Sequence, residues 1–377
     1  RLGEPEGSVF LAHLGAGGQH LFSGSTGASD ALADVASGPE GDLYVTGAFD
    51  GVINFGSGKL SGNDDGYLAA FTSGGVSDFS RSIGSEHSDW LYQVAATPAG
   101  DVVVSGISGD DVDVGGGAPS VEYTTAQAIV VSYDRRGEYL WETRLDGYFS
   151  NTTAIAVDAA GQVAVGGTAY DGLVFDGQAL PPGAFVAKLD SSGKPLWITL
   201  SSSVDGNIPS LRDVVAAPDG STFVSGFYYG SLALSGVSAP YTDNQSMFVL
   251  KLSPSGEPKY ILTYGTYDYG GAPEIAVAPN GDLLLGMTSY ENVDFGGGPV
   301  GGSGVGYDAL LARFTADGEH VASTSLPGTG SRYLADLAVD PTGKVVAIGT
   351  FDATLTLGET VLTSENTNSA FVARIDF

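Results

Sequence analysis

The chain has 377 residues, 42% of them hydrophobic, so it can bury a large core without disulfides or metals. Acidic residues outnumber basic ones by 44 to 15, and the formal charge of −29 argues against nucleic acid and anionic membranes as partners, because their phosphates would be repelled. The absence of cysteine excludes disulfides, thiolate chemistry and cysteine-ligated zinc. No apolar run is long enough to predict a membrane-spanning helix.

From the N-terminus onward, two kinds of predicted β-hairpin alternate. The first kind is clearest at Ala184–Trp197, where apolar residues alternate over Phe185–Leu189 and Gly193 supplies the positive φ of a tight turn. Its copies are Val9–Phe22, Tyr67–Phe79, Ala128–Trp141, Met247–Tyr260, Ala309–Ala322 and the truncated Ala370–Phe377. We name its two strands c and d.

The second kind of hairpin is clearest at Ile155–Gly167, with turn glycine Gly161. Its copies are Val35–Gly47, Val94–Gly106, Val214–Gly226, Ile275–Met287 and Leu337–Gly349. We name its strands a and b. Both kinds recur about every 60 residues, and this predicts an array of four-stranded antiparallel repeats with no helices.

A four-stranded antiparallel repeat is typical of a β-propeller blade. Six a–b hairpins predict an all-β, six-bladed β-propeller that forms a single domain over residues 1–377. The last repeat lacks strand d, so we expect N-terminal strands within 9–24 to join 335–377, complete the last blade and close the ring. Val9–Leu14 also has the pattern of a strand c, and this spare strand has no place in a six-bladed ring.

The turn and strand motifs carry a resemblance to a known group of proteins. Segments such as Ala184–Asp190, Gly193–Trp197 and Asp294-Phe295-Gly296-Gly297 resemble the repeats of bacterial β-propeller proteins, particularly the acidic, secreted or lipoprotein-like ones of myxobacteria. The resemblance covers nearly the whole chain and implies an exported propeller at the cell surface or outside the cell. A weaker likeness to the docking motif of quinoprotein propellers involves only Ala187, Gly193 and Trp197.

The b–c and d–a connections are long and should lie together at one end of each blade, opposite the tight turns. The d–a loops carry aromatic and acidic groups, a combination that suits a carbohydrate, because rings stack on its C–H face and carboxylates accept from its hydroxyls. The alternative is that these aromatics fill the seams between blades. The predicted ligand-binding residues are Glu86, His87, Asp89, Trp90, Tyr148, Phe149, Asp205, Tyr267, Asp268, Tyr269, Arg332 and Tyr333.

Two catalytic interpretations also arise from the d–a loops. His87 beside Glu86 and Asp89 has the groups for acid–base chemistry, although an ordinary loop histidine is the simpler explanation. Paired carboxylates at the channel mouth, among Glu86, Asp89, Asp205 and Asp268, suit a polysaccharide hydrolase or lyase. No nucleophile-elbow motif stands in a strand–turn–helix context.

Charged residues recur in two further places. Asp110, Asp111 and Asp113 in one b–c loop resemble part of a Ca²⁺-binding loop, although solvated loop acids are the simpler explanation. Lys188, Lys251, Arg313 and Arg374 share one position in strand c, and we expect them to meet turn acids such as Asp190.

Together these patterns favour an exported, monomeric binding or adhesion module with a glycan ligand, Ca²⁺ as its candidate cofactor and no nucleic-acid partner. A surface domain with a purely structural role is a further alternative.

Overall fold

The computed structural model describes residues 9–15, 17–26, 31–85, 88–109, 112–117, 127–147, 150–203, 207–234, 236–265, 271–340, 342–365 and 368–377. These residues form β-strands and no helix. The chain divides into two compact units, Arg1–Ile198 and Thr199–Phe377, which are described separately. The predicted all-β class is confirmed.

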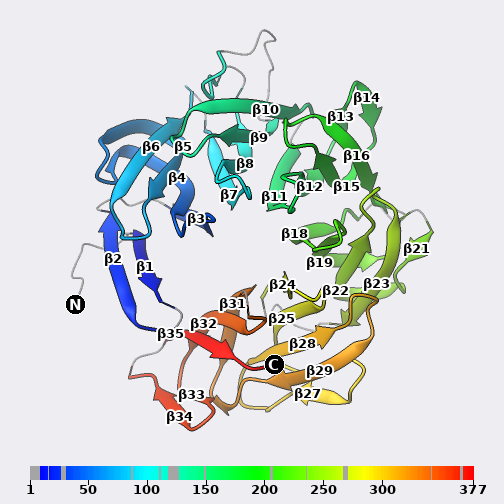
Figure 1. The fold of residues 1–377 in the computed structure, drawn as a ribbon. Coiled ribbons are helices and arrows are strands. Elements are labelled where there is room, and N and C mark those ends of the chain that lie inside the picture. The colour runs from blue at the N-terminus through cyan, green and yellow to red at the C-terminus, as the bar shows by residue number, and fades with distance from the viewer. Residues whose placement is uncertain are drawn as a thin grey trace. The chain divides into compact units, whose positions relative to one another are not determined.

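The first unit begins with a separate hairpin, β1 (Val9–Leu14) and β2 (His20–Thr26). Three four-stranded antiparallel sheets follow (Figure 1). Their strands are β3 (Ala31–Ser37), β4 (Leu43–Asn54), β5 (Lys59–Phe71) and β6 (Ser77–Ile83); β7 (Trp90–Ala96), β8 (Val102–Ser108), β9 (Gln127–Tyr133) and β10 (Tyr139–Leu145); and β11 (Ser150–Val157), β12 (Val163–Ala169), β15 (Gly183–Leu189) and β16 (Pro195–Leu200).

The second unit repeats the same sheet twice and ends with a three-stranded version. The four-stranded sheets comprise β18 (Ser210–Ala216), β19 (Thr222–Gly230), β22 (Thr242–Leu252) and β23 (Pro258–Gly265), and then β24 (Glu274–Val277), β25 (Leu283–Ser289), β28 (Asp308–Phe314) and β29 (His320–Ser325). The last comprises β31 (Arg332–Val339), β32 (Val345–Phe351) and β35 (Ser369–Ile375). These sheets run in the predicted order a, b, c and d, the organisation of propeller blades.

The predicted ring closure is not observed among the described strand pairs. β1 pairs with β2 along Val9–Leu14, and β35 pairs with β32 as the last strand of its sheet. The six-bladed ring and the single domain therefore stay predictions.

Several b–c connections are not simple loops, as the sequence suggested, but small antiparallel ribbons. They are β13 (Leu173–Phe175) with β14 (Gln178–Leu180), β20 (Leu232–Leu234) with β21 (Val237–Ser238), β26 (Asn292–Asp294) with β27 (Pro299–Gly301), and β33 (Thr354–Leu357) with β34 (Thr360–Thr363). In two of them a short d–a strand, β17 (Ser202–Ser203) or β30 (Gly328–Thr329), adds a third strand. We call the end of each sheet that carries these b–c ribbons and the d–a connections the long-loop end.

Within each unit, apolar side chains fill the space between neighbouring sheets. One core joins Leu68 and Ile83 of the first sheet to Leu91 and Val104 of the second. A recurring contact adds to it at the tight-turn end, where an aromatic side chain of strand d lies against the c–d turn glycine of the next sheet. The pairs are Phe22 with Gly75, Phe79 with Gly137, Trp141 with Gly193 and Tyr260 with Gly318.

The repeated cations of strand c form ion pairs, as expected, but with acids of the a–b turn. Lys188 Nζ lies 2.8 Å from Asp158 Oδ2, and both side chains are buried. The suggested partner was wrong, because the carboxylate of Asp190 instead accepts the backbone N–H groups of Ser192 and Lys194 in its own turn. The equivalent pairs are Lys251–Asp219, Arg313–Asp282 and Arg374–Asp340.

Candidate ligand-binding site

Most of the predicted ligand-binding residues lie outside the described residues. These are Glu86, His87, Tyr148, Phe149, Asp205, Tyr267, Asp268 and Tyr269. Asp89, Trp90, Arg332 and Tyr333 are described, and all four lie at or near the N-terminal end of a strand a, at the long-loop end of its sheet. The hydrogen bonds, ion pairs and ring contacts of these four residues are described next.

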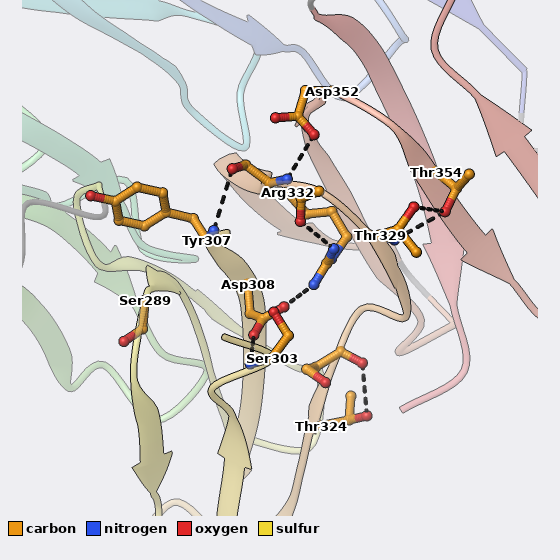
Figure 2. Close-up of polar contacts among 12 residues, drawn as sticks. Ser289, Ser303, Tyr307, Asp308, Thr324, Thr329, Arg332, Asp352 and Thr354 are labelled. Carbon is orange, nitrogen blue, oxygen red and sulfur yellow. Dashed lines mark hydrogen bonds and ion pairs between the residues drawn. The ribbon is translucent and has the colours of Figure 1, made fainter. Parts of the chain in front are cut away.

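At the long-loop end of the second unit, a buried ion pair joins Asp308, the first residue of β28, to Arg332, the first residue of β31. Both side chains are almost fully buried. The Asp308 carboxylate also accepts the backbone N–H of Ser303 at 2.8 Å, and Arg332 Nη1 donates to the carbonyl of Gly330 at 2.6 Å (Figure 2). Burial lowers the pKa of Arg332, and the nearby Asp352 carboxylate opposes that shift. The side chain of Arg332, a predicted ligand-binding residue, is therefore buried in an ion pair with Asp308.

Further hydrogen bonds from the backbone of Ser331 and Arg332 link this region to the sheet of β31, β32 and β35. The N–H of Arg332 donates to the carbonyl of Tyr307 at 2.8 Å, and the N–H of Ser331 donates to Asp352 Oδ1 at 2.7 Å (Figure 2). Asp352 returns a backbone hydrogen bond to the carbonyl of Ser331 at 3.1 Å. The b–c and d–a connections are thereby fixed to one another around Tyr307.

Three tyrosines form a row of contacting rings, and two of them, Tyr307 and Tyr333, directly neighbour Asp308 and Arg332 along the chain. The ring centroids of Tyr290 and Tyr307 are 5.7 Å apart in an edge-to-face arrangement, and those of Tyr307 and Tyr333 are 5.2 Å apart. Tyr290 is 45% exposed, while Tyr307 and Tyr333 are half-buried. In Figure 2 the Tyr307 ring points away from the ion pair. The predicted residue Tyr333 thus belongs to an aromatic surface, the tyrosine row Tyr290–Tyr307–Tyr333.

In the first unit, Asp89 is buried and engaged with loop backbone. Its carboxylate accepts the N–H of Ser85 at 2.7 Å and the N–H of Gly109 at 2.6 Å, which ties a d–a connection to the end of strand b. Burial raises the pKa of Asp89, and the neighbouring Asp65, itself raised in pKa by burial, pushes it the same way. Trp90 beside it is 41% exposed and contacts Tyr92 edge-to-face, so its ring offers a second aromatic surface.

The predicted calcium loop is described only at Asp113, because Asp110 and Asp111 lie outside the described residues. Asp113 Oδ1 accepts the N–H groups of Gly115 at 2.8 Å and Gly117 at 2.9 Å, and so it caps a turn. Asp294 makes the same two contacts with Gly296 and Gly298. Within the described part of the chain, no group of three His, Asp or Glu side chains is placed to hold a metal ion.

The sequence interpretation missed Tyr290 and Tyr307 as site residues. A usable signal existed, because Tyr170, Tyr229 and Tyr290 each stand nine residues after the turn glycine of their a–b hairpin. All three are exposed at the end of a strand b or just beyond it. An exposed aromatic repeated at one position of a repeat points to a surface role.

No family model and no curated protein matches the chain. Solved structures similar to it include the WD40 domain of Neurospora crassa Pan2, with 10% identity over 87% of this chain and 76% of that one and a TM-score of 0.47. A glucose dehydrogenase has 12% identity over 92% and 96%, with a TM-score of 0.43, and a Bacteroides caccae protein of unknown function has 13% over 66% and 69%, with a TM-score of 0.35. These TM-scores are too low to support a conclusion about function, and the myxobacterial resemblance stays a prediction.

The described residues contain no helix long and apolar enough to cross a lipid bilayer.

Proposed function

We propose that the protein is an exported, non-catalytic binding or adhesion module that takes a glycan at the long-loop end. The observation that carries this proposal is the tyrosine row, in which one exposed ring and two half-buried rings contact one another in sequence, and in which Tyr307 and Tyr333 directly neighbour Asp308 and Arg332 along the chain. Aromatic rings held in a row suit the apolar C–H faces of successive sugar units. A backbone hydrogen bond from Arg332 to Tyr307 joins the two segments that carry Tyr307 and Tyr333, so these segments lose little conformational entropy on binding.

We further propose that the sheets belong to a six-bladed propeller closed by the N-terminal hairpin. Within the first unit, Phe22 of β2 lies against Gly75, as Phe79 of β6 lies against Gly137. β2 therefore sits on the first sheet in the way that a strand d of a preceding sheet would. Among the described strands, none takes the place of strand d in the sheet of β31, β32 and β35.

The test is a glycan array probed with the whole chain, in the presence and absence of Ca²⁺, followed by Tyr290→Ala. Because a stacked ring contributes about 0.5–1.5 kcal/mol, this variant should bind a retained glycan about two- to tenfold more weakly. Tyr290→Phe keeps the ring and should bind nearly as the wild type does. The proposal fails if no glycan is retained, or if Tyr290→Ala binds with unchanged affinity. A requirement for Ca²⁺ would direct attention to Asp110, Asp111 and Asp113.

The alternative, a polysaccharide hydrolase or lyase, has less support. Of its four carboxylates, Glu86, Asp205 and Asp268 lie outside the described residues. Asp89 is buried, and three hydrogen bonds from Ser85 and Gly109 occupy its carboxylate. Cleavage of a polysaccharide that disappears in Asp205→Asn or Asp268→Asn would favour the enzyme.

A further inference from the structure

A second site lies at the tight-turn end of the first unit, away from the long-loop end. A cavity of about 180 Å³ opens between the sheet of β7–β10 and the sheet of β11, β12, β15 and β16. Thr97, Asp101, Ser132, Trp141, Ala160 and Ser191 line it. It therefore combines a carboxylate, hydroxyl groups and an indole ring.

The cavity lies beside Ser132, at the position of strand c where four other sheets have a lysine or an arginine. Ser132 pairs with Val103 across strands c and b, in the register in which Lys188 pairs with Ala164. Lys188 fills its own position and forms a buried ion pair with Asp158. Lysine or arginine also stands at this position in the three sheets that follow along the chain. Serine is several atoms shorter, and its side chain is buried, so the space that a long cationic side chain would fill is left open.

The counter-charge is still present. Asp101 follows the turn glycine Gly100 directly, as Asp282 follows Gly281. Asp282 pairs with Arg313 at 2.7 Å, whereas the position of Arg313 is taken in this sheet by Ser132, which pairs with Val103 as Arg313 pairs with Leu284. Burial raises the pKa of Asp101, Asp134 adds to that shift, and Arg135 opposes it. A desolvated carboxylate without its register partner gains from a cation beside it.

The nearest cation does not fill the cavity. The guanidinium of Arg135 donates to Glu40 Oε1 at 3.1 Å and to the carbonyl of Ala99 at 3.2 Å, and Arg135 is not among the lining residues. Arg135 therefore lies across the neighbouring turn, and Asp101 and Ser132 still face open space.

The indole ring of Trp141 forms one side of the cavity. Trp141 pairs with Ser132 across strands d and c, lies against Gly193, and donates from Nε1 to the carbonyl of Ser191 at 3.1 Å. These contacts fix the indole at the edge of the cavity. Tryptophan is the aromatic side chain that attracts cations most strongly.

We propose that this cavity binds an organic monocation, a primary ammonium or a guanidinium group. The Asp101 carboxylate supplies the counter-charge, the Ser132 hydroxyl accepts a hydrogen bond, and the Trp141 ring contacts the alkyl chain or the cationic head. A divalent metal fits poorly, because one carboxylate and neutral hydroxyls fall short of the six or more oxygen ligands that Ca²⁺ prefers.

The test uses isothermal titration calorimetry of the whole chain with three probes: n-butylammonium, methylguanidinium and N-acetyl-lysine methylamide. At least one should bind at millimolar concentration, and binding should quench Trp141 fluorescence. Binding of n-butylammonium or methylguanidinium alone assigns the cavity to free cations, and binding of the capped lysine extends it to lysine side chains of peptides. If none of the three binds, the proposal is overturned.

Three variants separate this site from general charge attraction by an acidic protein. Asp101→Asn should weaken binding by at least about tenfold, the loss expected for one charge-assisted contact. Ser132→Lys should place a tethered ammonium in the cavity, abolish binding and raise the unfolding temperature. Glu319→Gln removes a charge from an exposed turn elsewhere and should bind as the wild type does. The proposal is contradicted if Asp101→Asn binds the probes as tightly as the wild type does, or if Asp101→Asn and Glu319→Gln lose the same amount of affinity.

Discussion

The carboxylate of Asp34 accepts a hydrogen bond from the backbone N–H of Val94, a residue in strand a of the following sheet, at 2.9 Å. Its other oxygen accepts the N–H of Val35 in its own strand at 2.7 Å. Asp213 repeats the arrangement in the second unit with Ile275 and Val214. One aspartate position therefore links neighbouring sheets and also satisfies an amide beside the register shift of strand a.

Removing this link should destabilise the first unit. In Asp34→Ala two backbone N–H groups lose their acceptor, which costs about 1–3 kcal/mol for each amide that stays desolvated. Urea unfolding should show a lower free energy of unfolding by about that amount. Asp78→Ala removes an exposed carboxylate from β6 and serves as the control. Equal stability of the two variants would show that the Asp34 link contributes nothing.

The acid at the same position of β24 predicts a pH dependence of stability. The pKa of Glu274 is raised from 4.5 to about 8, chiefly by burial and also by the nearby carboxylates of Asp213 and Asp336, while Arg212 opposes the shift. A carboxyl group whose pKa is higher in the folded state stabilises the fold below pH 4.5, and this stabilisation is lost as the pH rises toward 8. The loss is at most about 1.4 kcal/mol per pH unit.

The variant Glu274→Gln should remove most of this dependence. Chemical unfolding measured from pH 4 to pH 9 should show a flatter profile and a higher stability at pH 9 than in the wild type. A profile that keeps the wild-type slope would show that Glu274 titrates normally.

The buried pair Lys188–Asp158 should be more sensitive to the loss of one member than of both. Lys188→Met leaves the Asp158 carboxylate buried without its cation, which typically costs about 3–5 kcal/mol. Asp158→Asn in the same chain removes the stranded charge, and its side-chain oxygen can still cap the turn at Ala160 and Gln162. The double variant should therefore be more stable than Lys188→Met alone, as a double-mutant cycle by urea unfolding will measure.

The contact between Trp141 and Gly193 can be tested by adding one methyl group. Gly193 has φ of 81°, and a Cβ atom there would lie 2.4 Å from the Trp141 ring. Gly177 has φ of 74° with open space around its Cβ position, so it shares the backbone strain without the clash. Gly193→Ala should lower the unfolding temperature more than Gly177→Ala. Similar losses would mean that the backbone conformation alone matters.

The repeating sheets could be predicted because their signals are local. Gly161 and Gly193 mark turns that need positive φ, and the alternation in Phe185–Leu189 marks a strand, so each repeat contains its own evidence of structure. The common position of Lys188 and its equivalents was visible in the same way. The partner of Lys188 was not, because Asp158 lies 30 residues earlier and the pairing depends on the register between strands b and c.

The candidate site was less predictable because burial depends on distant residues. Arg332 and Asp89 look like loop charges open to ligand, yet Asp308 and the backbone of Gly109 enclose them. Tyr290 and Tyr307 could be recognised as site residues only from the structure, because it is the fold that brings their b–c connection next to Tyr333. The predictions for His87, Asp205 and Tyr267 stay untested.

The b–c ribbons, such as β13–β14 and β26–β27, have a consequence for how new specificities can arise. The two strands of each ribbon pair with one another, and inward-facing side chains such as Val293 and Phe295 belong to the core between sheets, so the exposed ribbon residues can change while the sheet keeps its register. Grafting the ribbon of one repeat onto another should thus transfer recognition as a module. The surface of the protein can then change one repeat at a time, through exchange of single ribbons between repeats.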